Sequence, residues 1–270
     1  THIAVQSIPP LTVAAMRLFI ALLILYPVMR LAGQRLPAMG RLWFYIIGAS
    51  FFGNAFPFAL ISWGQVRVDA GLTAILMAIM PLMTVLLAHW VTVDEKLNRY
   101  KFVGVLLGLL GVVVLMGWDK LGELGDQMLR QYAIAGAALC YSVNALLTKK
   151  LTQVARLPMM AALMLASSIL LLPFSLVLER PWELPLAANS MTAVLILAVG
   201  PTAVATLMIL MLVDRQGASF LSQINFMVPL FGVAFAWIFL GERLPVNAWA
   251  ALVIILLGIL LSRLGNRQTA

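Results

Sequence analysis

Charged residues are scarce in this chain. Asp, Glu, Lys and Arg make up 10% of its 270 residues, whereas hydrophobic residues make up 63%. A soluble domain has about 25% charged residues, and each of its surface helices needs a polar face. Nearly every long segment of this chain is apolar all round, so the composition excludes a soluble domain and indicates a membrane protein.

Cysteine is almost absent, and no basic run is interleaved with aromatic residues. Cys140 is the single cysteine, which excludes an internal disulfide. The net charge of +8 comes from Lys and Arg in short loops and indicates a membrane rather than a nucleic-acid partner. The N-terminal "THIAVQSI" lacks the basic start and apolar core of a signal peptide. We expect no cofactor, no metal site and no nucleic-acid partner.

Long apolar segments fill almost the whole chain. A bilayer core of about 30 Å is crossed by about 20 apolar residues in a helix. The sequence contains nine complete segments of this kind, an apolar stub at 1–8, and short connections, of which 118–128 is the longest. This pattern predicts an all-α polytopic membrane protein without a soluble domain. The predicted spans are 10–33, 41–62, 70–91, 100–117, 129–149, 157–178, 189–212, 217–240 and 246–264.

The two halves of the chain are related by a shift of 148 residues, which becomes 147 after one deleted residue. Matches among apolar residues arise easily by chance, but two prolines, a glutamate and a glycine in one register do not. We therefore predict an internal repeat, with a first half at 1–120 and a second half at 128–265. The most informative pairs are Pro10 with Pro158, Pro81 with Pro229, Glu95 with Glu242, and Gly111 with Gly258.

The repeat also predicts the number and direction of the helices. Thr1 aligns with Lys149, at the end of span 129–149, so the chain begins where a first helix of about 20 residues should end. We expect a ten-span protein whose first helix is largely missing from this sequence. Five spans per repeat is an odd number, so the two five-helix repeats should cross the membrane in opposite senses, as an inverted pair within one integral membrane unit.

The distribution of basic residues supports this topology. If the missing helix starts inside, twelve Lys and Arg residues lie in inner segments and five in outer segments. Cytoplasmic loops carry the excess of Lys and Arg, so we expect both termini of the complete protein in the cytoplasm. The inner residues are Arg30, Arg35, Arg41, Lys96, Arg99, Lys101, Lys149, Lys150, Arg156, Arg215, Arg263 and Arg267, and the outer residues are Arg67, Lys120, Arg130, Arg180 and Arg243.

Inverted repeats with interrupted helices are typical of transporters, because two similar halves can exchange inward-open and outward-open states around a central site. Pro81 and Pro229 lie near the midpoints of their spans. Each proline lacks a backbone N–H and should free one carbonyl, that of Met77 and that of Asn225. Lipid cannot satisfy a free carbonyl, so these segments should face protein or a water-filled cavity. We predict that the two prolines mark hinge or gating helices.

Several motifs resemble those of one transporter family. They are "PPLTVAAMRLF" at 9–19, "DEKL" at 94–97, "LCYSVNALLTKKL" at 139–151 and "GERL" at 241–244, together with the paired prolines and glycines. In this combination the chain resembles an EamA-type member of the drug/metabolite transporter superfamily, most like the bacterial exporters of amino acids and related metabolites. The resemblance covers essentially the whole chain. It implies ten helices and a place in the bacterial cytoplasmic (inner) membrane, with Arg17 at the family's motif arginine.

Polar side chains within the spans are candidates for a substrate cavity. Tyr141 and Asn144 share a helix face, and Gln223 and Asn225 precede the proline of their span. Amides, hydroxyls and aromatic rings suit zwitterionic and amphipathic molecules. The alternative is hydrogen bonding between helices, worth about 0.6 kcal/mol per pair. The predicted cavity residues are Asn54, Tyr141, Asn144, Gln223 and Asn225.

Three further side chains have more than one interpretation. Arg17 lies about 10 Å into its helix, where it snorkels outward, pairs with helix ends or binds a substrate carboxylate. Trp63 belongs to an interfacial aromatic belt or to the cavity. His89 lies near the inner end of its span and is either structural or part of a proton relay.

Two other features are expected to serve packing. Glu95 and Glu242 lie in matched turns, where each should cap the following helix or take part in gating. The motif "GVLLG" at 104–108 should pack helices within the chain rather than form a dimer. We therefore expect a monomer or a weak dimer.

No Asp or Glu lies in the middle of any predicted span. A buried carboxylate is the usual device for proton coupling, so its absence favours facilitated movement or exchange over strict proton antiport. It also disfavours an intramembrane enzyme, which needs a base or a carboxylate dyad at membrane depth. A channel is a further alternative, and it would need a ring of like residues. We predict a non-enzymatic exporter of small metabolites that works by alternating access, with a small-molecule substrate and the lipid bilayer as partners. The alternatives are a carrier of nucleotide sugars or other solutes with the same fold and, less favoured, an intramembrane enzyme or a channel.

Overall fold

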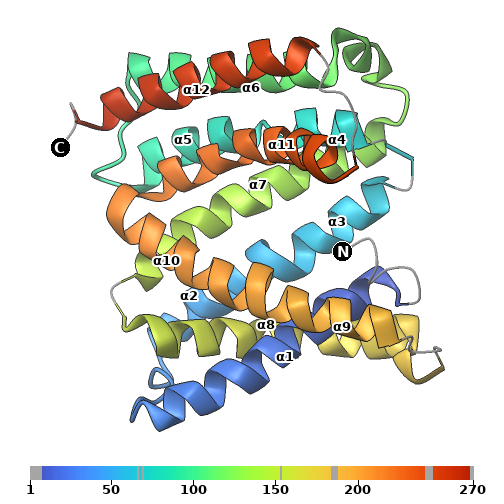
Figure 1. Cartoon of the computed structure of the whole chain (residues 1–270). Coiled ribbons are helices and arrows are strands. Elements are labelled where there is room, and N and C mark those ends of the chain that lie inside the picture. The colour runs from blue at the N-terminus through green and yellow to red at the C-terminus, as the bar shows by residue number, and fades with distance from the viewer. Residues whose placement is uncertain are drawn as a thin grey trace. The chain divides into compact units, whose positions relative to one another are not determined.

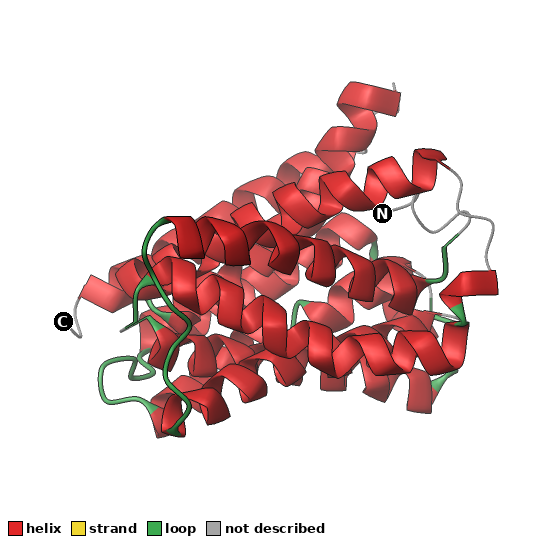
Figure 2. Cartoon of the chain, turned by 90° about the horizontal axis from the view of Figure 1, so that it is seen from below, coloured by secondary structure: helices red, strands yellow, loops and turns green. Residues whose placement is uncertain are grey.

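The computed structural model describes residues 8–65, 67–68, 70–152, 154–183, 188–240 and 246–267. Within these ranges the chain is helical, with loops at the helix ends and no strand (Figures 1 and 2). The elements are α1 (Pro10–Leu31), α2 (Arg41–Ser50), the π-helical η2 (Phe51–Ala55), α3 (Phe56–Gln65), α4 (Ala70–Met77), α5 (Met80–Val91), α6 (Arg99–Met116), the 3-10 helix η3 (Trp118–Glu123), α7 (Met128–Leu151), α8 (Arg156–Glu179), the 3-10 helix η4 (Pro181–Glu183), α9 (Ala188–Leu197), the π-helical η5 (Ala198–Val204), α10 (Ala205–Gln216), α11 (Ala218–Leu240) and α12 (Val246–Arg267).

The predicted spans are helical over most of their described length, so the all-α polytopic membrane fold is confirmed. Three spans are not single regular helices. Spans 41–62 and 189–212 contain the π-helical segments η2 and η5, and span 70–91 is divided into α4 and α5. Six stretches of the described chain are long and apolar enough to cross a membrane: Leu11–Leu31, Leu72–Val91, Arg99–Met116, Arg156–Glu179, Ala188–Gln216 and Asn247–Gly265.

Contacts divide the chain into two compact units. Unit 1 contains residues 1–59 and 147–215, and unit 2 contains residues 60–146 and 216–270. Each unit therefore takes helices from both predicted repeats. The predicted repeats, at 1–120 and 128–265, divide the sequence in a different way and stay a prediction.

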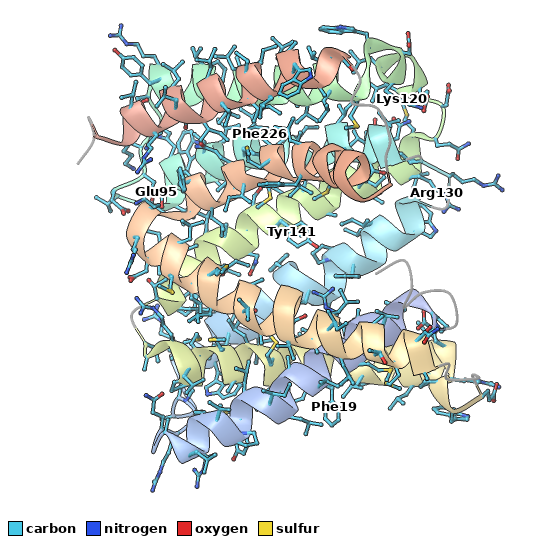
Figure 3. The ribbon with its side chains drawn as sticks, viewed as in Figure 1. Phe19, Glu95, Lys120, Arg130, Tyr141 and Phe226 are labelled. Atoms are coloured by element: carbon cyan, nitrogen blue, oxygen red, sulfur yellow. The ribbon has the colours of Figure 1, made fainter. Side chains whose placement is uncertain are left out.

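The core of unit 1 forms where α1 packs against α8. Alanines such as Ala21 and Ala161 are fully buried there and let the two helix backbones approach. Glu179, the last residue of α8, caps the start of α1, because its carboxylate accepts from the N–H groups of Leu11 and Thr12 at 3.1 and 2.6 Å. Away from the core, large apolar side chains such as Phe19 are exposed, as lipid-facing surfaces require (Figure 3).

The core of unit 2 forms where α6 packs against α12. A Cβ atom on Gly104 would lie 2.5 Å from the carbonyl oxygen of Gly258, and one on Gly258 would lie 2.6 Å from that of Gly104. The two backbones are therefore in direct contact, as a GxxxG motif allows. Phe226 of α11 fills the space beside Gly108 (Figure 3). The predicted role of "GVLLG" in packing within the chain is confirmed.

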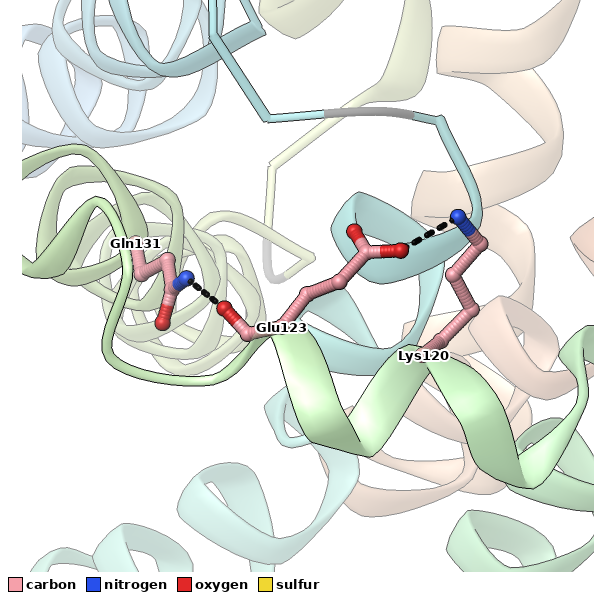
Figure 4. A network of polar contacts seen from close by, with 3 residues as sticks. All are labelled: Lys120, Glu123 and Gln131. Carbon is pink, nitrogen blue, oxygen red and sulfur yellow. Dashed lines mark hydrogen bonds and ion pairs between the residues drawn. The ribbon is translucent and has the colours of Figure 1, made fainter.

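The longest connection, between α6 and α7, is fixed by its own polar contacts. Lys120 Nζ donates to the Glu123 carboxylate at 2.7 Å (Figure 4). Gln131 at the start of α7 donates from Nε2 to the Glu123 carbonyl oxygen at 2.8 Å, and its Oε1 accepts from the Gly125 N–H at 3.0 Å. This loop is a structural turn within unit 2.

Candidate substrate site

The helix of the third predicted span is broken at its middle. α4 ends at Met77 and α5 begins at Met80, with a two-residue turn between them. In this turn the N–H of Ile79 donates to the carbonyl of Leu76, only three residues back, at 3.3 Å. Pro81 is buried in the first turn of α5, where its missing N–H is tolerated. The predicted interruption at Pro81 is confirmed.

Hydroxyl groups contact the backbone at the start of α5. The hydroxyl of Ser142, on α7, lies 3.0 Å from the Met80 carbonyl oxygen and 2.9 Å from that of Ala138. Thr84 Oγ1 donates to the same Met80 carbonyl at 2.9 Å. The Ser142 contact places the start of α5 against α7.

Tyr141 lies on α7 (Figure 3). Asn144 lies one helical turn later on the same helix, and the two residues are on either side of Ser142 in the sequence. Both are half-buried, and both make contacts with other residues. A spacing of three residues puts them on the same side of the helix. The structure therefore keeps this pair together within unit 2, and its role in a cavity stays a prediction.

Gln223 is buried between α11 and α12. Its Nε2 donates to Ser262 Oγ at 2.6 Å, and its side chain is 2% exposed. Its Oε1 has no hydrogen-bond partner among the described residues. The contact is of the kind expected from the alternative interpretation, a hydrogen bond between helices. A role of Gln223 in the cavity stays a prediction.

Asn225 and Pro229 lie on α11, which runs from Ala218 to Leu240 as one helix. This differs from the expected interruption at Pro229 and from the break observed at Pro81. A membrane helix can continue through a proline where neighbouring groups satisfy the freed carbonyl. The side chains of Asn225 and Pro229 lie outside the described residues, and the hinge role of both prolines stays a prediction.

The two π-helical segments occur at equivalent places in the two predicted repeats. Asn54 in η2 and Thr202 in η5 are related by the shift of 148 residues. Pro57 follows η2 closely, and Pro201 lies within η5. Each proline removes a backbone N–H inside a predicted span. The two prolines are the features of the sequence that could have indicated the π-helical segments. The spans were nevertheless predicted as uninterrupted there.

Arg17, on α1, binds the second π-helical segment within unit 1. Its Nε donates to Thr202 Oγ1 at 2.8 Å, and that hydroxyl lies 2.9 Å from the carbonyl oxygen of Leu197. Pro201 offers no N–H to the Leu197 carbonyl four residues earlier. In the π-helical η5, which follows Leu197, this carbonyl pairs with residue 202 instead, and the Thr202 hydroxyl adds a second contact to it. Of the interpretations of Arg17, the structure favours contact inside the helix bundle over snorkelling.

Asn54, at the position equivalent to Thr202, makes a contact from the first π-helical segment to α8. Its Nδ2 donates to Ser167 Oγ, on α8, at 2.8 Å. Each π-helical segment thus binds the helix of the other predicted repeat, because η2 contacts α8 and η5 contacts α1. Thr202 and Ser167 are polar partners that the sequence does not single out, because they are common residues in apolar helices.

Glu95 caps the start of α11 (Figure 3). Its two carboxylate oxygens accept from the N–H groups of Ala218 and Ser219, at 2.9 and 2.8 Å. Gly217 precedes the helix with a φ of +84°, and a Cβ there would lie 2.6 Å from Glu95 Oε1. Glycine is therefore favoured at this position by its backbone conformation, and a side chain there would displace the Glu95 carboxylate from the cap.

The expectation that Glu95 caps the helix following it is corrected by this contact. The following helix, α6, is capped by Asn98, whose Oδ1 accepts from the N–H of Lys101 at 2.9 Å. Asn98 is the better local cap, because its short side chain reaches the N–H group three residues on. Glu242 lies outside the described residues.

Trp63 and His89 have structural contacts near helix ends. The guanidinium carbon of Arg130 lies 4.4 Å from the centre of the Trp63 ring, and Arg130 also donates to the Trp63 carbonyl. This exposed cation–π pair fits an interfacial belt. His89 Nδ1 accepts from the N–H of Leu97 at 3.2 Å, which stabilises the turn between α5 and α6.

The five predicted cavity residues do not belong to one unit. Asn54 lies in unit 1, and the other four lie in unit 2. The structure brings Asn54 to Ser167 and Gln223 to Ser262, and it keeps Tyr141 beside Asn144. That all five line one cavity stays a prediction.

Known proteins resemble this chain in sequence over nearly its whole length. A model of the EamA-like transporter family matches residues 1–117 and 131–264. The "Uncharacterized transporter YoaV" of Bacillus subtilis (strain 168) is 24% identical over 265 residues, which cover 96% of this chain and 89% of that protein. The "Probable amino-acid metabolite efflux pump" of Salmonella typhimurium (strain LT2) is 26% identical over 288 residues, which cover 98% of this chain and 89% of that protein.

One protein of known crystal structure has a similar fold. Its TM-score is 0.81 at 20% sequence identity, and the match covers 96% of this chain and 90% of that chain. The likeness supports the helical fold described above. The two segments matched by the family model also have nearly the bounds predicted for the two repeats.

Proposed function

The chain belongs to the EamA-like transporter family, and from this premise we propose that it exports small metabolites, namely amino acids and related amphipathic compounds, by alternating access. The family and the relatives establish the general class of protein. The protein is a multi-pass bacterial membrane transporter, and the two relatives described above are named as a transporter and an efflux pump.

The break between α4 and α5 is the observation that carries the proposal. Discontinuous helices build the binding sites of many secondary transporters at mid-membrane depth. At this break the Met80 carbonyl oxygen lies 3.0 Å from the hydroxyl of Ser142, which is adjacent to Tyr141 on α7. Neutral polar and aromatic groups of this kind suit a zwitterionic or amphipathic substrate.

The substrate class has two further supports. The similar Salmonella protein is named as a probable amino-acid metabolite efflux pump. The sequence has no Asp or Glu in the middle of a predicted span, which favours exchange or facilitated movement over strict proton antiport. A carrier of nucleotide sugars or other solutes is the competing assignment.

The proposed setting is the bacterial cytoplasmic membrane, with both termini on the cytoplasmic side. The excess of Lys and Arg in the predicted inner segments supports this orientation. The proposed partners are a small-molecule substrate and the lipid bilayer. We propose a monomer or a weak dimer, because the GxxxG motif of α6 is occupied by α12 of the same chain.

Counterflow in proteoliposomes tests the proposal. The reconstituted protein is offered labelled amino acids, nucleotide sugars and amphipathic compounds, with and without unlabelled substrate on the opposite side and with and without a pH gradient. We expect trans-stimulation by amino acids that does not require the gradient. Conductance without trans-stimulation would identify a channel, and stimulation by nucleotide sugars alone would replace the proposed substrate class.

A further inference from the structure

The connection between α1 and α2 carries three arginines and no acidic residue. Arg30 lies in the last turn of α1, Arg35 in the loop and Arg41 at the start of α2. No Asp or Glu precedes Asp69 in the sequence, so no acidic neighbour along the chain balances this charge. All three side chains are exposed, and none of them forms an ion pair with another described residue. Their positive charge is therefore open to a ligand.

The backbone of this loop is fixed near both of its ends. Gly33 has a φ of +72°, and its N–H donates to the Arg30 carbonyl at 3.1 Å, which ends α1 in the left-handed turn that favours glycine. Beyond the loop, the indole N–H of Trp43 donates to the Pro37 carbonyl at 3.0 Å. Arginines on a fixed loop lose less conformational entropy on binding than arginines on a free tail.

Large apolar side chains beside the arginines are exposed as well. Leu31, Met39 and Phe44 are 89%, 83% and 75% exposed. The apolar stretch of α1 that is long enough to cross a membrane ends at Leu31, so this segment lies where a bilayer passes from acyl chains to headgroups. Basic groups beside exposed apolar side chains match a ligand that is both anionic and apolar. An anionic phospholipid has this chemistry, whereas free phosphate lacks the apolar part.

The equivalent connection in the other predicted repeat lacks this charge. Under the shift of 148 residues, the positions equivalent to the three arginines are Leu178, Glu183 and Asn189. Glu183 forms an ion pair with Arg180 at 3.6 Å, so charge is balanced there. The repeat itself therefore does not account for the three arginines. Helix stability does not account for Arg41 either, because the helix dipole disfavours a cation at the first residue of a helix.

We propose that Arg30, Arg35 and Arg41 bind the phosphate headgroup of an anionic phospholipid, with Leu31 and Met39 against its acyl chains. Guanidinium groups bind phosphate oxygens through paired, charge-assisted hydrogen bonds. Basic clusters at the end of a membrane helix bind anionic lipids. The inference goes beyond the transport activity and does not depend on the substrate. Basic residues in inner loops also orient helices during insertion, a role that requires no bound lipid.

Thermal unfolding of the purified protein in detergent separates these roles. The midpoint is measured with added phosphatidylglycerol, with phosphatidylcholine of the same acyl chains, and with inorganic phosphate. A ligand that binds only the folded protein raises the midpoint. We expect a rise with phosphatidylglycerol alone, and a smaller rise at high salt because salt screens exposed charges. An equal rise with phosphatidylcholine or with inorganic phosphate would overturn the inference, and so would no rise with phosphatidylglycerol.

The variant Arg30→Gln/Arg35→Gln/Arg41→Gln removes the three charges. The concentration of phosphatidylglycerol that gives half of the rise should increase at least tenfold. Arg35→Gln alone, which changes only the loop between the helices, should increase it several-fold and gives the same comparison if the triple variant does not fold.

A matched control removes the same charge from exposed residues of three other helices, in the variant Arg99→Gln/Lys150→Gln/Arg263→Gln. This variant should bind phosphatidylglycerol as the wild-type protein does. An equal loss in the two triple variants would show that overall charge, and not this loop, attracts the lipid, and would overturn the inference. Wild-type affinity in the loop variants would overturn it as well.

Discussion

Glu95 supplies the missing hydrogen-bond partners at the start of a helix 123 residues later in the chain. Each carboxylate oxygen accepts one backbone N–H of the first turn of α11, and the glutamate is 6% exposed. The first N–H groups of a helix lack partners, and the positive end of the helix dipole favours an anion there. This contact explains why a carboxylate is tolerated in a buried position next to a membrane helix.

Glu95→Gln should therefore destabilise the protein by about 1–2 kcal/mol, because an amide has only one acceptor oxygen and turns an N–H donor toward the second backbone N–H. The measurement is the midpoint of thermal unfolding in detergent. Glu123→Gln is the matched control, since its carboxylate forms a partly exposed pair with Lys120 and should leave the midpoint nearly unchanged. Equal midpoints for the two variants would contradict the capping role.

Asn144 is the best-placed neutral amide for testing the predicted cavity. It is half-buried on α7, one turn after Tyr141. Asn144→Ala should reduce amino-acid flux in proteoliposomes about tenfold, as expected for the loss of a substrate hydrogen bond. The amount of folded protein should not change. Asn225→Ala should act in the same way if the two amides share the cavity.

Leu139→Ala is the control for Asn144→Ala. Leu139 lies on the same helix and is 43% exposed, on a surface suited to lipid. Its truncation should leave flux unchanged. Unchanged flux in Asn144→Ala as well would remove Asn144 from the predicted cavity.

A proline within a predicted span does not by itself break the helix. Pro27 and Pro173 lie inside α1 and α8, both of which are continuous. Pro81 instead follows the break between α4 and α5, where Thr84 donates to the Met80 carbonyl and the Ser142 hydroxyl lies 3.0 Å from it. Within the described chain, hydroxyl donors from a neighbouring helix and from the same helix accompany the interruption. The sequence shows the proline, but the partner that stabilises the break comes from tertiary packing.

Pro81→Ala should lower the turnover rate of transport several-fold and change KM less than twofold. The alanine supplies an N–H for the Met77 carbonyl, so α4 and α5 can join into a stiffer helix. Counterflow rates over a range of substrate concentrations measure both constants. Pro173→Ala, in an exposed position of continuous α8, should change neither. A change in KM alone would count against a hinge at Pro81.

The contact between α6 and α12 depends on the absence of side chains. Gly104→Ala places a Cβ 2.5 Å from the Gly258 carbonyl oxygen, which is backbone and cannot move aside alone. We expect a loss of stability of about 1–3 kcal/mol, measured by thermal unfolding. Gly122→Ala is the control, because no atom lies within 4 Å of the added Cβ. If both variants unfold at the same temperature, the close packing does not determine stability.

At the scale of the whole molecule, the helical spans were predictable because their length and apolar composition are properties of single segments. The packing of "GVLLG" and the break at Pro81 followed from local motifs in the same way. The cap from Glu95 to α11 and the contact of Arg17 with Thr202 were not predictable, because their partners are 123 and 185 residues apart. Buried polar pairing depends on which helices meet, and no periodicity in the sequence reports that.

The two compact units each combine helices from both predicted repeats. Two repeats combine in this way when elements of one repeat pack against elements of the other. Here η2 of the first predicted repeat contacts α8 of the second, and η5 of the second contacts α1 of the first. Transporters with inverted repeats use equivalent elements on opposite sides of the membrane. Opposite sidedness of equivalent loops is therefore the property that tests the predicted inverted repeat.

Gln34 and Trp182 are equivalent positions under the shift of 148 residues, and both are exposed. Gln34→Cys and Trp182→Cys are made separately in a Cys140→Ser background, and intact cells are treated with a membrane-impermeant maleimide. The inverted topology predicts labelling of position 182 from outside and labelling of position 34 only after the membrane is opened. The first loop carries Arg30 and Arg35 near Gln34, as an inner loop should.

Gly122→Cys provides an outer reference for this experiment, because it lies in the exposed loop before α7, which the same topology places outside. It should label from outside together with position 182. Labelling of positions 34 and 182 from the same side would contradict the inverted repeat, since parallel repeats place equivalent loops together. Labelling of position 34 from outside and of 122 and 182 only after opening would keep the inverted repeat but reverse the orientation. The excess of basic residues would then mark the outer face, against the charge rule that orients most membrane proteins.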